Sequence, residues 1–294
     1  MTGKLYREVE KAAQSGQDLS VGGVLSKLGL SRSGYYDFHG RKPSETDLRR
    51  DAVMDKILEI YDGSNQIYGA PKIREELLKS GILISERTVS NYMKMLDIHA
   101  CWVKKSVRTT IDPDFSLKLH NLLKQDFNPK KPDEYWCTDI TYIWTLEGFV
   151  YLTCIMELYS RKIIAWDLSD SLESSGVVSA IEKAIKLRHC KPKIIHTDRG
   201  CQFVSASWSK ATKGIKKSYS KKAFPWDNAC IESFHSLIKR EWLNRFVIRD
   251  HTHARELIFE YIDAFYNTHR THSHCGYKSP NDFEKAYTDT FKAS

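Results

Sequence analysis

Three carboxylates in this sequence have surroundings that suit metal-assisted chemistry, although long stretches of chain separate them. Asp139 falls inside the strand-like run WCTDITYIW, where a buried carboxylate must be paired, exposed at an edge or bound to a cation. Asp198 ends the strand-like run KIIHTD directly before Arg199 and Gly200, a position common in the functional clefts of α/β sheets. Glu232 lies on a predicted helix, beside its apolar face and not within it. The three acids could therefore converge on one pocket.

Carboxylates arranged in this way would support phosphoryl chemistry. Mg²⁺ prefers carboxylate oxygens, keeps several waters and takes substrate phosphate oxygens as further ligands. Two such ions about 4 Å apart can activate a nucleophile and stabilise the leaving oxygen in an in-line displacement at phosphorus. Taken singly, each acid is more often a surface or capping residue. We expect Asp227 to cap the helix that carries Glu232.

The elements around these acids predict a mixed α/β layer. Strand-like runs with short connections indicate an antiparallel meander, and a helical pattern and a further short strand follow it. The predicted strands cover residues 135–145, 149–158, 162–168 and 193–197, and the predicted helix covers 173–187. A helix between strands, followed by a strand that ends in an acid, is typical of a helix-covered mixed sheet.

The first hundred residues predict helices only. Ser20 and Ser31 can cap two short helices separated by Gly29, residues 41–47 indicate a linker, and a helix is predicted over 51–61.

The segment from Tyr68 to Ile98 predicts a clearer helix-turn-helix. Pro71 suits a first helical turn, Gly81 ends the first helix and Ser85 caps the second. The outward side of the second helix carries the small polar and basic residues that recognition helices present to DNA, namely Arg87, Ser90, Asn91 and Lys94. A plain solvated helical hairpin remains the alternative.

The overall composition fits a folded basic protein. The 294 residues are 41% hydrophobic, the formal net charge is +8, and no run approaches the ~18 apolar residues of a membrane helix. The seven cysteines include no C-x-x-C pair, which argues against a disulfide framework or a zinc ribbon and favours a reducing, cytoplasmic setting. The histidines near the end of the chain lack the closed spacing of a zinc site.

Positive charge is concentrated in two stretches. Between Lys186 and Lys222 there are eleven Lys or Arg residues and a single acid, Asp198. This density favours phosphate binding, and the candidate contacts are Lys216, Lys217, Lys221 and Lys222. The basic tract from Lys104 to Lys131 could be a solvated linker or an arm that follows phosphates.

Several motifs occur together in one order and carry a family resemblance. They are WCTDITYI, YSRKIIAW, HTDRGCQF, WDNACIESFHSLIKREW and NTHRTHSHCGYKSP. With them the chain resembles the insertion-sequence transposases with a DDE integrase core, and most closely the group whose second reading frame encodes the catalytic part. The segment IYGAPKIREELLKSGILISERTVSNYMKMLDI resembles that group's helix-turn-helix, and LGLSRSGYYDF resembles its start. The resemblance covers nearly the whole chain and implies an α/β, RNase H-like fold. This is a mixed five-stranded sheet flanked by helices and preceded by an all-helical, helix-turn-helix region.

The resemblance also implies residue roles. Asp139, Asp198 and Glu232 match the catalytic, metal-binding triad, which implies two Mg²⁺ ions, with Mn²⁺ as a substitute. Lys239 matches the family's basic residue seven positions after the glutamate and is implied to contact donor-end DNA. Asp227 and Asn228 match the D-N-A motif and are expected to support the local structure, with Asn228 reaching nearby backbone.

The chain departs from the family pattern at a few positions. The spacing from Asp198 to Glu232 is slightly shorter than usual, and four positions carry unusual residues, Glu157 for Asp, Ala223 for Gly, Thr271 for Pro and Cys275 for Leu. None of these changes removes a predicted metal ligand.

We therefore predict a DNA transposase or integrase, a polynucleotidyl transferase that cleaves and joins DNA strands at the ends of an insertion sequence. The expected divisions are an N-terminal helical, helix-turn-helix-like region (1–62), a helix-turn-helix DNA-binding domain (63–100), a basic linker (101–134) and an integrase core with C-terminal helices (135–294). The expected partners are element-end and target DNA, further copies of the chain, and an upstream helix-turn-helix transposition protein or fusion. The expected setting is the bacterial cytoplasm at the nucleoid, with no membrane. Two alternatives remain, a non-catalytic DNA-binding regulator or partner-dependent subunit, and a structure-selective nuclease with the same metals.

Overall fold

The structure is a computed structural model, and it describes residues 5–6, 9–10, 20–40, 44–100, 119–221 and 224–292. Most of the basic tract before residue 119, together with Lys222 and Ala223, lies outside the described residues. The chain divides into two compact units, Met1–Leu58 and Glu59–Ser294.

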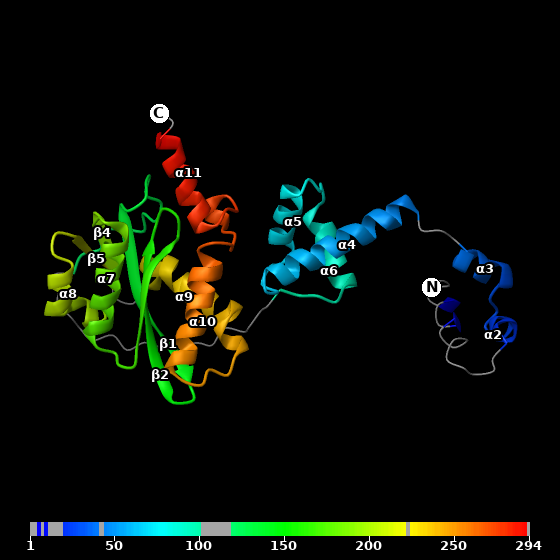
Figure 1. Cartoon of the computed structure of the whole chain (residues 1–294), viewed down its shortest axis with the longest axis horizontal. Helices are drawn as coiled ribbons and strands as arrows, with labels where there is room; N and C mark the ends of the chain where they lie inside the picture. Colours follow the sequence, from blue (N-terminus) through cyan, green and yellow to red (C-terminus); the bar gives the residue numbers. More distant parts are fainter. Residues whose placement is uncertain are drawn as a thin grey trace. The chain divides into compact units, whose positions relative to one another are not determined.

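A mixed five-stranded sheet forms the centre of the second unit (Figure 1). The strand order is β3-β2-β1-β4-β5, with β1–β2 and β2–β3 antiparallel and β1–β4 and β4–β5 parallel. The strands are β1 (Tyr135–Thr145), β2 (Gly148–Glu157), β3 (Ile163–Ser169), β4 (Ile194–Thr197) and β5 (Lys216–Tyr219). The antiparallel meander and the mixed five-stranded sheet flanked by helices, both expected from the sequence, are confirmed.

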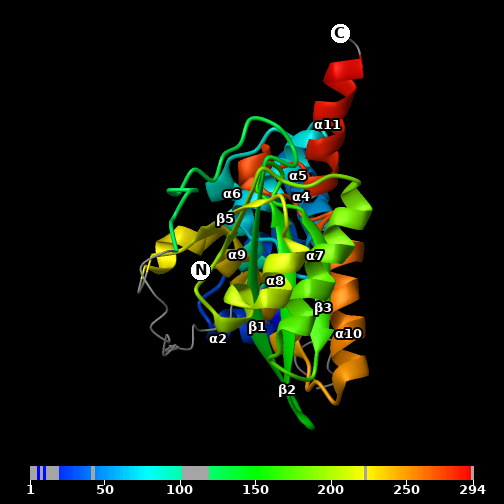
Figure 2. The ribbon, with the colours of Figure 1, turned by 90° about the vertical axis from the view of Figure 1, so that its left-hand side faces the viewer.

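Helices cover both faces of the sheet, and further helices precede it in the chain. The α-helices are α2 (Val21–Lys27), α3 (Arg32–Gly40), α4 (Glu45–Gly63), α5 (Ala70–Lys79), α6 (Glu86–Met95), α7 (Ser174–Arg188), α8 (Ala206–Ala211), α9 (Ala229–Glu241), α10 (His251–Phe259) and α11 (Pro280–Lys292). Short 3₁₀ turns span Cys201–Val204, Pro225–Asn228, Leu243–Arg245 and Ser273–Cys275. Helices α7 and α8 lie on one face and α9 and α10 on the other, and Figure 2 turns α7 and α8 toward the viewer. No helix within the described ranges is long and apolar enough to cross a membrane.

The two faces of the sheet differ in chemistry. Trp136 on β1 and Ile195 on β4 belong to a fully buried core that includes the apolar side of α7. Side chains alternate along a strand, so Cys137 and His196 point to the opposite face, toward α9. The α7 side of the sheet therefore forms an apolar core, while Cys137 and His196 belong to the α9 side.

The helical region before the sheet differs from expectation at one boundary. The structure has a helix from Glu45, so the predicted linker over 41–47 is wrong in its last part. The Ser44 hydroxyl accepts a hydrogen bond from the Asp47 amide (3.2 Å), and the Asp47 carboxylate accepts from Ser44 in return. This reciprocal cap starts α4 several residues before the apolar pattern does.

The predicted second helix-turn-helix is present as α5 and α6. Ile73 and Leu77 of α5 and Val89 and Met93 of α6 are buried. The amide of Thr88 donates to Ser85 Oγ (3.1 Å), which confirms the predicted cap. The segment just before α5 is bonded to the chain near residue 270, since the hydroxyl of the buried Tyr68 donates to the His269 carbonyl (3.2 Å) and accepts from the Thr271 amide (2.9 Å).

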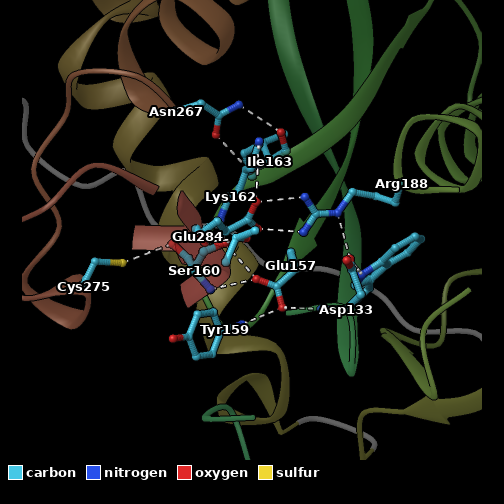
Figure 3. A network of polar contacts seen from close by, with 12 residues as sticks. Asp133, Glu157, Tyr159, Ser160, Lys162, Ile163, Arg188, Asn267, Cys275 and Glu284 are labelled. Carbon is cyan, nitrogen blue, oxygen red and sulfur yellow. Dashed lines mark hydrogen bonds and ion pairs between the residues drawn. The ribbon is translucent and has the colours of Figure 1, made fainter. Parts of the chain in front are cut away.

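The C-terminal part contains two features that the sequence pattern did not predict. Helix α10 continues as a π-helix over Glu260–Tyr266. Helix α11 is anchored to the sheet by a polar network, in which the Arg188 guanidinium pairs with both oxygens of Glu284 (2.8 and 2.7 Å) and with Asp133 (2.8 Å) (Figure 3). The fully buried carboxylate of Glu157 accepts from the amides of Tyr159 and Ser160 (2.8 and 2.7 Å) in the same network.

Candidate active site

Asp139 and Asp198 occupy matching positions on neighbouring parallel strands. The pairing of β1 with β4 aligns Tyr135 with Ile194 and Cys137 with His196. Continued by two residues, this register sets Asp139 level with Asp198, which directly follows β4. Parallel strands lie about 4.8 Å apart, and level residues point to the same face. Asp139, two residues after Cys137 on β1, therefore belongs to the α9 face of the sheet, and Asp198 lies just past the end of the adjacent strand β4.

Helix α9 runs along β1 on this face. At its start, the Asn228 amide nitrogen donates to the Thr138 carbonyl (3.3 Å), and near its end Lys239 Nζ donates to Thr141 Oγ1 (2.6 Å). Glu232 lies between these two contacts on the helix. The helix thus presents Glu232 to the segment of β1 that holds Asp139.

The electrostatics indicate that Glu232 and Asp139 are close. The side chain of Glu232 reaches solvent, but neighbouring atoms partly bury its carboxyl group, and the negative charge of Asp139 adds to this effect. Together they raise the pKa of Glu232 to about 7. Two carboxylates that repel each other in this way form the electrostatic condition that a bound divalent cation relieves.

Asp198 is held by a tight turn at the end of β4. Its Oδ1 accepts a hydrogen bond from the Gly200 amide (2.9 Å). A Cβ at position 200 would lie 3.1 Å from that same oxygen and 3.0 Å from Gln202 Oε1, so the turn favours glycine. Two residues before Asp198, the buried His196 ring contacts the hydroxyls of Ser218 (2.8 Å) and Ser220 (3.1 Å), which fixes β4 against the edge strand.

The predicted cap by Asp227 is wrong. The residue at the N-cap of α9 is Asn228, and its side chain makes no capping hydrogen bond. The buried Asp227 carboxylate accepts instead from Gln125 Nε2 (3.0 Å) and from the Lys221 amide (2.9 Å). Asp227 lies within the 3₁₀ turn Pro225–Asn228, one position before the N-cap, and its carboxylate is bonded to other segments of the chain. The expected contact of Asn228 with nearby backbone is confirmed at Thr138.

His235 is the residue of this site that the sequence analysis missed. It lies three positions after Glu232 on α9, and its Nδ1 is 3.3 Å from Asp139 Oδ2. The spacing places His235 on the same side of the helix as Glu232, which was the available signal. Thr141, the partner of Lys239, was missed for a different reason, since its contact joins residues far apart in the chain.

The three carboxylates have the right chemistry to bind a divalent cation, but they do not form a complete set of metal ligands in this structure. No group of three His, Cys, Asp or Glu side chains within the described ranges is placed so as to hold a metal ion. The available oxygens, from Asp139, Asp198 and Glu232, are the hard donors that Mg²⁺ and Mn²⁺ prefer. Binding of a cation would require these carboxylates to move closer together.

The predicted DNA-contact residues lie at two separate places. On α6, Arg87, Asn91 and Lys94 are exposed and Ser90 is half-buried, opposite the buried Val89 and Met93. Near the sheet edge, Lys216 and Lys221 are exposed, and half-buried Lys217 donates to Ser209 Oγ (2.9 Å). Lys222 lies outside the described residues.

Comparison with known families gives three matches along the chain. A family model described as an integrase core domain matches residues 129–225, and a second model with the same description matches residues 213–280. An HTH-like domain model matches residues 48–106. Together these matches include α5, α6, the whole sheet and α9.

Curated relatives match over most of their length. The transposase for insertion sequence element IS904 of Lactococcus lactis is 34% identical over 248 residues, which are 83% of this chain and 98% of the relative. Transposase InsF for insertion sequence IS3A of Escherichia coli is 32% identical over 275 residues, 91% of this chain and 94% of the relative. A solved structure of the HTLV-2 integrase catalytic core domain covers 53% of this chain and 98% of its own, at 18% identity and a TM-score of 0.42.

Proposed function

Because this chain belongs to the insertion-sequence transposases and is a DNA transposase of the integrase-core type, we propose that Asp139, Asp198 and Glu232 are its catalytic carboxylates. Asp139 lies on β1, Asp198 directly follows the adjacent parallel strand β4, and the charge of Asp139 acts on Glu232 of α9; this juxtaposition carries the proposal. Their reaction is the cleavage of DNA at the element ends and the transfer of the freed 3′ strand to target DNA.

The integrase-core family generally uses divalent metal ions, and we propose two Mg²⁺ ions here, with Mn²⁺ as a substitute. Bound cations would activate the attacking water or hydroxyl and stabilise the leaving oxygen at phosphorus. Asp139, Asp198 and Glu232 would hold these ions.

Basic residues of the chain supply the remaining electrostatic attraction. Lys239 lies beside Thr141, two residues beyond Asp139 on β1, where its ammonium attracts the donor-end phosphate. Helix α6 offers Arg87, Ser90, Asn91 and Lys94 to the terminal repeat, and Lys216, Lys217, Lys221 and Lys222 add positive charge near the sheet edge.

The division of labour follows the predicted domains. The helix-turn-helix (63–100) recognises the element ends, the integrase core (135–294) performs the chemistry, and the N-terminal region (1–62) and basic linker (101–134) add contacts to DNA or to other subunits. Cutting and joining two ends together requires more than one active site, so we propose a homo-oligomer, with an upstream helix-turn-helix protein as a further partner. Its substrate places it on the bacterial nucleoid.

A strand-transfer assay on the element's own terminal repeats tests this function. The full-length chain, alone and with the upstream protein, is expected to release 3′-hydroxyl ends in Mg²⁺ and to join them to target DNA. Asp139→Asn should lower both rates about 1,000-fold, as loss of a metal ligand costs several kcal/mol in the transition state, while band-shift affinity is retained. Asp170→Asn, at a carboxylate exposed just after β3, is the charge-matched control.

The outcomes separate the alternatives. DNA binding without cutting, even with the upstream protein present, would support a regulator. Cut ends that never join target DNA would support a nuclease. Normal cleavage and joining by Asp139→Asn would overturn the assignment of the carboxylates.

A further inference from the structure

His235 is an unusual residue to find inside the α9 packing surface. It is 5% exposed, and its ring lies next to that of Phe234, with 5.9 Å between the ring centroids. Among the described residues its Nε2 has no hydrogen-bond partner. Its other nitrogen, Nδ1, is 3.3 Å from Asp139 Oδ2.

This arrangement is costly unless the Nδ1 contact compensates for it. A buried ring nitrogen without a partner loses its hydrogen bonds to water, at about 1–3 kcal/mol. A phenylalanine would fill a similar volume at this position without that loss. The contact with Asp139 is therefore the feature that distinguishes histidine from an apolar residue here.

The geometry limits what the Asp139 carboxylate can do. One oxygen, Oδ2, faces His235, and the side chain is only 18% exposed. An N–H at Nδ1, 3.3 Å from Oδ2, would restrict rotation of the carboxylate about its Cβ–Cγ bond, so that Oδ1 is left in a defined direction. Residues that fix metal ligands in this way are as important for affinity as they are for geometry.

We propose that His235 is a positioning residue that holds the Asp139 carboxylate in the orientation needed for cation binding. The inference rests on the proposed function in one respect, namely that Asp139 binds a cation. His235 touches neither the cation nor the DNA. It acts through Asp139 alone.

Three substitutions separate this role from packing. In His235→Asn, the amide nitrogen is the same number of bonds from the backbone as Nδ1, so a donor to Asp139 is retained. In His235→Gln, the amide reaches the position of Nε2 instead, and His235→Phe keeps the ring but has no donor. Loss of an outer partner of a metal ligand weakens metal binding about 10- to 100-fold.

The readout is Mn²⁺ binding by the full-length chain without DNA, measured by electron paramagnetic resonance, alongside the melting temperature. We expect His235→Asn to bind Mn²⁺ within about threefold of the parent, and His235→Phe and His235→Gln to bind at least about tenfold more weakly. A melting temperature of His235→Phe equal to or above that of the parent, together with weaker Mn²⁺ binding, excludes a general folding defect.

Asp139→Asn provides the control that separates the two proposals. If Asp139→Asn weakens Mn²⁺ binding but His235→Phe does not, the positioning role is wrong and the proposed site stands. If all three His235 variants bind equally weakly, the donor at Nδ1 is not what matters, and the positioning role is again wrong. If Asp139→Asn binds Mn²⁺ like the parent, the metal site itself is wrong, and the proposed function fails with it.

Discussion

The ammonium of Lys239 lies 2.6 Å from the hydroxyl of Thr141, two residues along β1 from Asp139. This contact joins the positively charged side chain of Lys239 on α9 to β1, the strand that carries the proposed metal ligand Asp139. It gives Lys239 a fixed place, where a surface lysine would sample many directions.

Replacing Lys239 by Met should weaken the binding of donor-end DNA about 10-fold, because a hydrogen bond to a charged group contributes about 1.5–3 kcal/mol. The slope of log affinity against log salt concentration should fall by about one. Thr141→Ser, which keeps the hydroxyl, is the matched control and should leave both quantities unchanged. Equal salt slopes for Lys239→Met and the parent, in fluorescence anisotropy titrations, would contradict a phosphate contact.

Substitutions on the exposed side of α6 are expected to affect recognition of the terminal repeat. Arg87→Ala and Lys94→Ala should each weaken binding of the terminal repeat, and the one that reads a base should lower its discrimination from unrelated DNA by about 1–3 kcal/mol. Lys285→Ala removes an exposed lysine from α11 and serves as the control. If Lys285→Ala and the α6 variants affect repeat binding equally, α6 is not a recognition helix.

Glu157 predicts a pH dependence of stability. Burial, more than the nearby charge of Glu284, raises the pKa of Glu157 to about 7 in the folded chain, from an ordinary value of 4.5, against the opposing hydrogen bonds of Tyr159 and Ser160. The folded chain therefore binds more protons than the unfolded chain between these two values, so this residue's contribution to stability falls as the pH rises through that window. The contribution lost is on the order of 3 kcal/mol at most.

Urea unfolding of the parent and of Glu157→Gln between about pH 5 and pH 8 measures this effect. The glutamine variant loses hydrogen bonds and should be less stable overall, but its free energy of unfolding should fall less steeply with pH. Parallel curves for the two proteins would show that Glu157 does not titrate in this range.

The pairing of Arg188 with Glu284 predicts the cost of releasing α11. The two side chains are 15% and 13% exposed and share two hydrogen bonds. Arg188→Met leaves the Glu284 carboxylate largely buried with fewer partners, and should lower the free energy of unfolding by about 3 kcal/mol. Lys183→Met, on the same helix, removes the more exposed partner of Asp167 and should cost far less. Chemical denaturation of both variants tests the difference.

The first strand of the sheet could be predicted because its sequence signals, alternating β-forming residues and a nearby turn glycine, involve only neighbouring residues. The run that became β1 was bounded correctly at Tyr135 and Thr145, since alternating β-formers and the following Gly148 mark both of its ends. The caps at Ser20 and Ser85 were predictable for the same reason, because each involves an amide only three residues away.

The contacts that were not predictable join distant parts of the chain. Aspartate is a residue type that often caps helices, but the carboxylate of Asp227 accepts a hydrogen bond from Gln125, 102 residues away in the chain. The short strand β5 was not predicted as a strand because its first two residues are lysines, and it forms only because β4 offers it a parallel neighbour. The π-helix after Phe259 leaves no mark in the sequence, because the apolar spacing over residues 254–265 is that of a regular α-helix.

The hydroxyl of Tyr68 has a practical consequence for anyone who wishes to dissect this protein. A fragment that begins after the helix-turn-helix would leave the buried amide of Thr271 without its acceptor and the carbonyl of His269 without its donor. Thr271 is followed directly by the loop that leads to α11, so a truncation designed to isolate the integrase core would loosen its far end. The helix-turn-helix and the integrase core are therefore best compared by point substitution within one intact polypeptide.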